Sequence, residues 1–132
     1  MSQIDTKEIQ LHNGVVIPTL GYRVDKDHGE NNYERILSAI NVGFRHFDIS
    51  PESMTEKAAG RAFQDSKVNR SELFITAKLN NDNHGYQQAL REFDHTLKRL
   101  QTDYVDLFLI NWPNPSKYRD TYEETAIETW KA

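Results

Sequence analysis

Short apolar runs alternate with segments of helical periodicity along most of the 132 residues, and this alternation leaves few folds open. The runs cover residues 19–24, 44–48, 73–78 and 104–111, and a segment with helical spacing follows each of them. Parallel strands need a crossover of a dozen or more residues, and right-handed crossovers place the helices on one side of the sheet. The sequence therefore predicts an α/β chain with a parallel sheet. Four such units are half of an eight-stranded barrel.

An antiparallel hairpin is predicted before the first unit. Residues 9–11 and 15–17 flank His12, Asn13 and Gly14. An Asn-Gly pair between apolar runs is the strongest short hairpin signal. Pro18 ends the hairpin, since proline has no N–H to donate to a partner strand.

Helical spacing predicts an amphipathic helix in each unit. The first helix covers residues 30–42 and stops at Gly43, and the third runs from about residue 86 to residue 100. Two pairs of residues have the spacing of capping boxes that begin the second and fourth helices: Ser53 with Glu56, and Thr121 with Glu124. The fourth helix is expected to turn three residues inward: Ala126, Ile127 and Trp130.

Composition excludes several classes of function. The net charge is -4 with mixed signs, so no basic stripe for nucleic acid is present. No apolar run approaches the roughly 20 residues that span a bilayer, and the polar N-terminus lacks a signal-peptide core, so no membrane partner is expected. The absence of cysteine excludes thiol catalysis and fits a cytoplasmic location. The five histidines lack paired metal-ligand spacing, and the length suits a single domain over residues 1–132.

Three predicted strands end on polar side chains, namely Asp48, Lys78 and Asn111. Alternate residues of a strand share one face, and parallel strands end at the same edge of a sheet. That edge is where α/β folds place ligand chemistry. We therefore expect the three side chains to converge at one rim of the sheet.

Four motifs carry a resemblance to a known family. They are LHNGV at residues 11–15, GFRHFD at 43–48, ELFITAKL at 72–79 and LQTDYVDLFLINWP at 100–113. With these motifs the chain resembles the N-terminal half of the aldo-keto reductases. The resemblance implies a TIM-type β/α barrel, of which this chain would form half, and the reduction of aldehydes and ketones with NADPH.

The resemblance also assigns site residues. Two of the family's four catalytic positions are retained, as Asp48 and Lys78, whereas Ser53 stands in place of the tyrosine acid and Asn111 in place of the histidine. Four further positions correspond to the family's substrate pocket: Arg23, Asp25, Asn80 and Trp112. The residues that grip NADP(H) lie mostly in the second half of the family's barrel, so cofactor binding by this chain is not expected.

Structural interpretations compete with the catalytic ones at several of these positions. An ion pair at the sheet rim accounts for Asp48 and Lys78 better than a working catalytic pair does. Ser53 is better explained as a helix cap than as a nucleophile, because no base is available to it. The Arg23 guanidinium either holds an anion or, as we favour, pairs with Asp25 or Asp48.

The favoured hypothesis is a truncated aldo-keto reductase homologue, catalytically disabled, that covers its open sheet face by self-association. The alternative is a weak NADPH-dependent oxidoreductase whose site is rebuilt across a dimer. A third possibility is a truncated or designed chain with no activity of its own.

Overall fold

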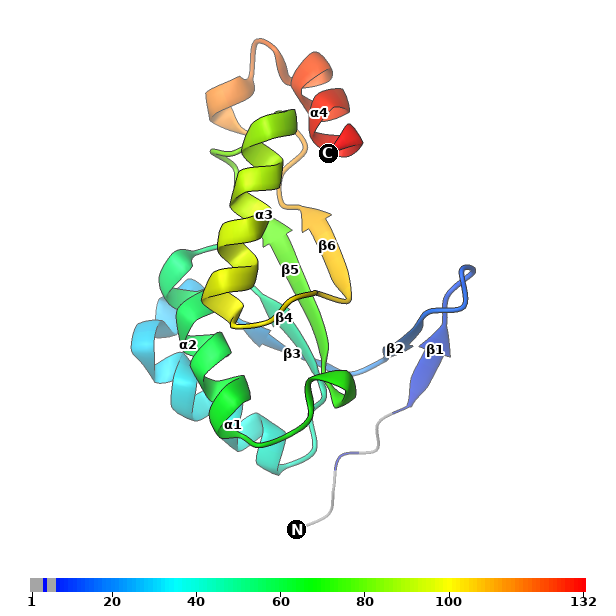
Figure 1. Cartoon of the computed structure of the whole chain (residues 1–132), viewed down its shortest axis with the longest axis vertical. Helices are drawn as coiled ribbons and strands as arrows, with labels where there is room; N and C mark the ends of the chain where they lie inside the picture. The colour runs from blue at the N-terminus through cyan, green and yellow to red at the C-terminus, as the bar shows by residue number, and fades with distance from the viewer. Residues whose placement is uncertain (1–3, 5–6) are drawn as a thin grey trace.

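The computed structural model describes Ile4 and residues 7–132. Near the N-terminus, β1 (Glu8–Gln10) and β2 (Val16–Pro18) pair antiparallel, as the Asn-Gly signal predicted. Gly14 occupies the turn with φ of 86°, a left-handed conformation that glycine adopts without strain. Figure 1 shows this hairpin projecting to one side of the rest of the molecule.

Four parallel strands form the main sheet in the order β3-β4-β5-β6. Their bounds are Gly21–Val24, His46–Ile49, Phe74–Leu79 and Leu107–Ile110. The connecting helices are α1 (Asn32–Asn41), α2 (Ser53–Asp65) and α3 (Tyr86–Leu100), with α4 (Tyr122–Lys131) after the last strand. Short 3-10 turns cover Lys26–Asn31, Arg70–Glu72 and Ser116–Tyr118. The fold class predicted from the alternation of strands and helices is therefore confirmed.

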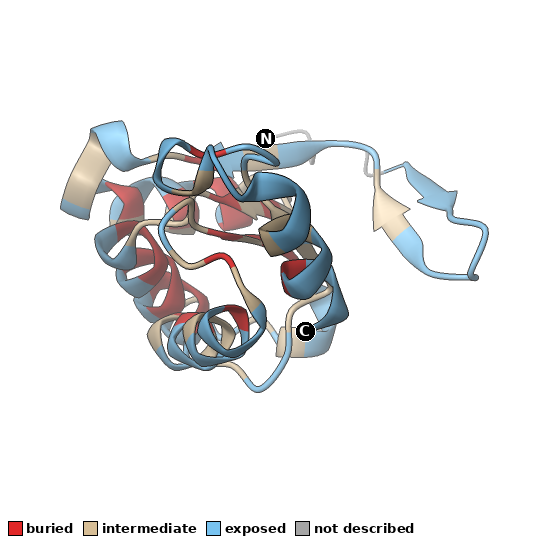
Figure 2. Ribbon diagram, turned by 90° about the horizontal axis from the view of Figure 1, so that it is seen from above, coloured by how far each residue is buried: buried red, intermediate tan, exposed pale blue. Residues whose placement is uncertain are grey.

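One face of the sheet holds the core. Helices α1, α2 and α3 pack on that face, and the buried residues concentrate where they meet the strands (Figures 1 and 2). Phe47, Ile49 and Ile75 have no exposed surface there, and the ring of Phe47 meets that of Phe63 at 5.2 Å. No helix of the described residues packs on the opposite face, which presents the alternate residues of each strand (Figure 1).

Several predicted element bounds differ by one to three residues, and two of the differences have a clear cause. The first helix begins at Asn32 rather than at residue 30, because the preceding residues form a 3-10 turn after Asp25, whose carboxylate accepts from the backbone N–H of Asp27 at 3.1 Å. The last strand begins at Leu107 rather than at residue 104. The Asp106 carboxylate accepts from the backbone N–H of Ile75 at 2.8 Å, in place of a backbone carbonyl, while the Asp106 N–H donates to Ile75 O at 3.0 Å.

Neither predicted capping box forms. Glu52, not Ser53, is the N-cap of α2. The Glu56 carboxylate bonds to Arg99 instead of accepting from a backbone N–H at the start of the helix. Thr121 is the N-cap of α4, but its side chain makes no cap bond. Its Oγ1 lies 3.2 Å from the Thr125 hydroxyl.

The predicted inward face of α4 is also wrong. Trp130 is 82% exposed and Ile127 is 57% exposed. Helix α4 lies beyond the end of the sheet and packs against α3 (Figure 1), and this placement leaves both side chains largely exposed. Its buried residue is Thr129, whose hydroxyl accepts from the backbone N–H of Gly85 at 2.7 Å.

The described residues contain neither a membrane-spanning helix nor a cluster of metal ligands. None of the helices there is long and apolar enough to cross a membrane. No cluster of three or more histidine or acidic side chains in that part of the chain could hold a metal ion. His46 is a half-buried residue of β4, and its ring nitrogens lie 3.2 Å from Pro18 O and 3.0 Å from Thr76 Oγ1.

Candidate functional site

Strand register brings polar residues together on the helix-free face. Arg23 of β3 stands opposite Asp48 of β4, and Asp48 in turn stands opposite Thr76 of β5. Lys78 follows Thr76 by two residues and therefore shares its face. The apolar neighbours Phe47 and Ile49 point to the helices instead, so this alternation separates the polar rim from the core.

The predicted ion pair at the rim is present. The Lys78 ammonium bonds to Oδ1 of Asp48 and lies 3.3 Å from the backbone oxygen of Ile49. The side chain of Lys78 is 19% exposed and that of Asp48 is 39% exposed, so water reaches the pair. Each charge compensates the other at the place where the strands end.

A cavity of about 330 Å³ opens at this rim. Six predicted site residues line it: Arg23, Asp25, Asp48, Lys78, Asn111 and Trp112. Five further residues that the sequence did not single out complete the lining: Lys26, Asp27, Ser50, Pro51 and Glu52. The expected convergence of Asp48, Lys78 and Asn111 is therefore confirmed.

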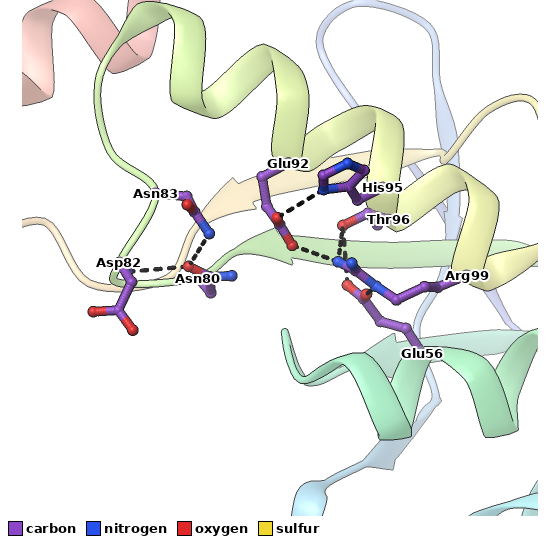
Figure 3. Close-up of polar contacts among 8 residues, drawn as sticks. All are labelled: Glu56, Asn80, Asp82, Asn83, Glu92, His95, Thr96 and Arg99. Carbon is purple, nitrogen blue, oxygen red and sulfur yellow. Dashed lines mark hydrogen bonds and ion pairs between the residues drawn. The ribbon is translucent and has the colours of Figure 1, made fainter.

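Ser53 and Asn80 lie outside the lining of this cavity. Ser53 is the exposed first residue of α2. The amide oxygen of Asn80 accepts from the backbone N–H of Asp82 at 3.0 Å and from the side chain of Asn83 at 2.8 Å (Figure 3). Asn80 thus shapes the loop after β5.

The predicted pairing of Arg23 with an aspartate is wrong. No carboxylate of the described residues lies within ion-pair distance of the Arg23 guanidinium, although Asp25 and Asp48 line the same cavity. Asp48 is taken by Lys78, and the Asp25 carboxylate faces the backbone of Asp27. The guanidinium on β3 is therefore exposed at the rim without an ionic partner there.

Glu52 is the lining residue that the sequence analysis missed most clearly. Its Oε2 is buried and has no hydrogen-bond partner within the described part of the chain. Buried carboxylate oxygens are normally hydrogen-bonded, so this atom is unusual. The available signal was an acidic residue between Pro51 and the expected helix start, which the capping-box interpretation of Ser53 obscured.

A buried ion cluster joins α2 to α3, away from the rim. Arg99 bonds to the carboxylates of both Glu56 and Glu92, and the Thr96 hydroxyl donates to Glu56 at 3.0 Å (Figure 3). Burial raises the pKa of the Glu56 carboxyl, although the hydrogen bonds from Arg99 and Thr96 oppose that shift. The cluster is enclosed between two helices and serves packing rather than ligand binding.

The rim residues do not offer a complete site for a dinucleotide. The cations lining the cavity are Arg23, Lys26 and Lys78, and the last is already paired with Asp48. Four carboxylates line the same small cavity and would repel phosphate groups: Asp25, Asp27, Asp48 and Glu52. No step through a bound nucleotide is derived from this set of residues.

Comparison with known proteins decides the relationship. The family model described as "Aldo/keto reductase family" matches residues 21–132, which includes every strand of the main sheet. This chain belongs to the aldo/keto reductase family.

Curated relatives of this aldo/keto reductase chain include the glyoxal reductase of Bacillus subtilis, 42% identical over 115 residues. That match covers 86% of this chain and 42% of the relative. The morphine 6-dehydrogenase of Pseudomonas putida is 40% identical over 124 residues, covering 94% of this chain and 40% of the relative. The chain thus spans less than half the length of these curated relatives.

Solved structures agree with the family assignment. An aldo/keto reductase from Brucella melitensis superposes with a TM-score of 0.86 at 38% identity, covering 97% of this chain and 48% of that one. An aldo-keto reductase of Bombyx mori, solved in complex with NADP, gives a TM-score of 0.84 at 29% identity and covers 97% of this chain and 45% of that one. The four-stranded sheet is therefore part of the barrel of this family, whose members bind NADP(H).

Proposed function

We propose that this chain is an aldo/keto reductase homologue that is severely impaired in, or incapable of, NADPH-dependent carbonyl reduction. The observation that carries the proposal is that no tyrosine among the described residues lines the rim cavity beside Lys78. Tyr22 belongs to rim strand β3 itself, but its ring packs against Phe44 and Phe47 on the helix-covered side.

The missing phenol matters because carbonyl reduction needs a proton at the developing alkoxide. A tyrosine next to a lysine ammonium can supply that proton, whereas an aliphatic hydroxyl is far too weak an acid. Ser53 is exposed outside the cavity, and Asn111 offers a neutral amide in place of an imidazole. Loss of general acid catalysis alone costs about 10²–10⁴-fold in rate.

Weak or absent cofactor binding is the second part of the proposal. The relatives are more than twice as long as the segment they share with this chain, and the cavity is lined by more carboxylates than cations. A nucleotide with several phosphates would meet repulsion there rather than a cationic cradle. The absence of cysteine further supports a cytoplasmic location.

Titration with NADPH, followed by the fluorescence of the reduced nicotinamide, tests the cofactor part of the proposal. We expect no saturable change for the full chain, and the same flat response for Lys78→Met. Saturable binding at micromolar NADPH that Lys78→Met weakens would overturn it. Circular dichroism of both proteins provides the control, because a lost far-ultraviolet signal would identify misfolding as the cause of a flat titration.

The alternative is a reductase whose site is completed by a second copy of the chain. Strands β3 and β6 are the two edges of the parallel sheet and have no partner strand beyond them in the described residues. A two-fold axis along the barrel direction would set β6 of one copy beside β3 of the other and give eight parallel strands. The relative named glyoxal reductase makes glyoxal the first aldehyde to try with such an assembly.

Self-association through the open sheet face is proposed with either function. Light scattering at micromolar concentration should give a dimer, and Leu109→Lys should yield monomer, because Leu109 is 40% exposed on edge strand β6. The matched control is Met54→Lys, which alters a side chain 57% exposed at the start of α2. A monomer in the unaltered chain would contradict self-association and the dimeric reductase together.

A further inference from the structure

Two polar groups in the rim cavity lack partners, and they have opposite requirements. The Arg23 guanidinium, on β3, is a hydrogen-bond donor and a cation with no carboxylate at ion-pair distance in the described chain. Oε2 of Glu52, in the turn before α2, is a buried acceptor with no donor in the described residues. Both residues line the same cavity, yet they do not pair with each other.

The other charged groups of the cavity do not meet these requirements. Asp48 is bonded to the Lys78 ammonium. The Asp25 carboxylate accepts from the backbone N–H of Asp27 at 3.1 Å and lies 3.8 Å from Nε2 of His28. Of the lining carboxylates, Glu52 and Asp27 make no ion pair in the described chain, and neither lies within ion-pair distance of the Arg23 guanidinium. Arg23 and Glu52 are held by different elements, β3 and the turn before α2.

Leaving a buried acceptor such as Glu52 Oε2 without a donor costs free energy. The Arg23 guanidinium is exposed, and it presents a cation that an anion at the rim can bind. A ligand that brings one carboxylate and one hydroxyl would meet both requirements at once. Its carboxylate would accept the two parallel N–H groups of the guanidinium, a geometry that arginine provides and lysine does not. Its hydroxyl would donate to Glu52.

We propose that the rim cavity is a binding site for a small hydroxylated carboxylic acid, with the carboxylate on Arg23 and a hydroxyl donating to Glu52. Asn111 offers an amide on the opposite strand end for a further hydrogen bond. A volume of about 330 Å³ is at the small end of ligand pockets and suits a molecule of a few carbon atoms. This site does not depend on the proposed loss of reductase activity.

Charge selects this class of ligand over two others. Three cations and four carboxylates line the cavity, so a phosphate carrying two charges would be repelled more strongly than a single carboxylate. A metal ion is not favoured, since no group of three or more acidic or histidine side chains in the described residues has ligand geometry. A single carboxylate bound at Arg23 lies next to a cation without an ionic partner in the described chain, and Lys26 is a second such cation in the lining.

The test uses the full chain and three matched three-carbon compounds. D-glycerate carries the carboxylate and the hydroxyls, propionate carries the carboxylate alone, and glycerol carries hydroxyls alone. Trp112 lines the cavity and is 57% exposed, so its emission reports binding once the chain's other tryptophan is removed by Trp130→Phe. Saturation-transfer NMR of each compound detects binding that leaves Trp112 emission unchanged.

We expect glycerate to bind in the millimolar range and more tightly than propionate, with glycerol weakest. Arg23→Gln should weaken glycerate about tenfold or more, because a hydrogen bond to a charged group is lost. Glu52→Gln should remove the preference for glycerate over propionate. The matched control is Arg91→Gln, an exposed arginine on α3 outside the cavity, which should leave all three affinities unchanged.

Two outcomes would overturn the site. Equal loss of glycerate binding in Arg23→Gln and Arg91→Gln would mean that only the overall charge matters. The absence of any glycerate signal by both methods, with the unaltered chain folded by circular dichroism, would mean that Arg23 and Glu52 satisfy each other in solution.

Discussion

The two faces of the four-stranded sheet are built from the same strands, but one buries apolar side chains and the other pairs charged side chains in contact with water. On the helix-covered face, Phe47, Ile49 and Ile75 are fully buried and need only apolar neighbours. On the helix-free face, Asp48 and Lys78 pair with each other at the rim and remain in contact with water. The covered face therefore secures the fold, while side chains on the helix-free face can change without unfolding the chain.

Truncation of a core ring should give the largest difference between the faces. Phe47→Ala removes a side chain packed against Phe63 and Tyr22 and should lower the free energy of unfolding by about 3–5 kcal/mol. Leu109→Ala, on the helix-free face and 40% exposed, should cost less than about 1 kcal/mol. Urea denaturation measures both, and equal losses would mean that the helix-free face is packed in solution.

The two ion pairs sharpen the comparison further. Glu56→Gln weakens a hydrogen bond between charged groups at a place where Glu56 is 1% exposed, and it should cost about 2 kcal/mol, because Glu92 still compensates the charge of Arg99. Asp48→Asn breaks a pair that water reaches and should cost less than about 1 kcal/mol. Denaturant midpoints of the two variants decide the order, and a larger loss for Asp48→Asn would contradict the structural difference between the pairs.

His84 should make stability depend on pH. Its side chain is 2% exposed, and burial lowers the pKa of its imidazole. The unfolded chain therefore takes up the proton first, so stability is full above about pH 6.5 and falls as the pH drops toward the lowered pKa of the folded state, by at most about 1.4 kcal/mol per pH unit.

The variant His84→Phe keeps a ring to stack on Tyr118, whose ring lies 5.5 Å away. The melting temperature of this variant should fall less than that of the unaltered chain as the pH drops below about 6.5. Parallel pH profiles for the variant and the unaltered chain would show that His84 does not titrate between the two states.

Ser53→Ala should have the smallest effect. Loss of a capping side chain costs about 1 kcal/mol, but Ser53 makes no cap bond and is exposed. We expect a change within about 0.5 kcal/mol by urea denaturation. A loss of about 1 kcal/mol would restore the capping role that the sequence suggested.

The sequence predicted those features that depend on periodicity. Alternation within the strands placed Asp48 and Lys78 on one face and Phe47 on the other, and the spacing of strands and helices gave the parallel sheet. It failed where long-range contacts compete with local signals. Glu56 has capping-box spacing but bonds to Arg99, 43 residues away, and the exposure of Trp130 depends on where α4 lies relative to the sheet.

The candidate site was predicted in part for the same reason. Its members at strand ends, such as Lys78 and Asn111, follow from register, whereas Glu52 belongs to a turn whose path no local pattern specifies. Arg23 makes no ion pair with its neighbouring aspartates, because Asp25 accepts from the backbone of Asp27 and Asp48 pairs with Lys78. The contact between Asp48 and Lys78 joins two strands, and no local sequence pattern specifies it.

The most direct test of the central claim is aldehyde-dependent oxidation of NADPH by the full chain, followed by absorbance at saturating cofactor and aldehyde. We predict a rate indistinguishable from that of Lys78→Met, because the ammonium has no phenol to assist. A rate well above background that disappears in Lys78→Met, with both proteins folded, would contradict the account and show that the retained Asp48–Lys78 pair still serves catalysis.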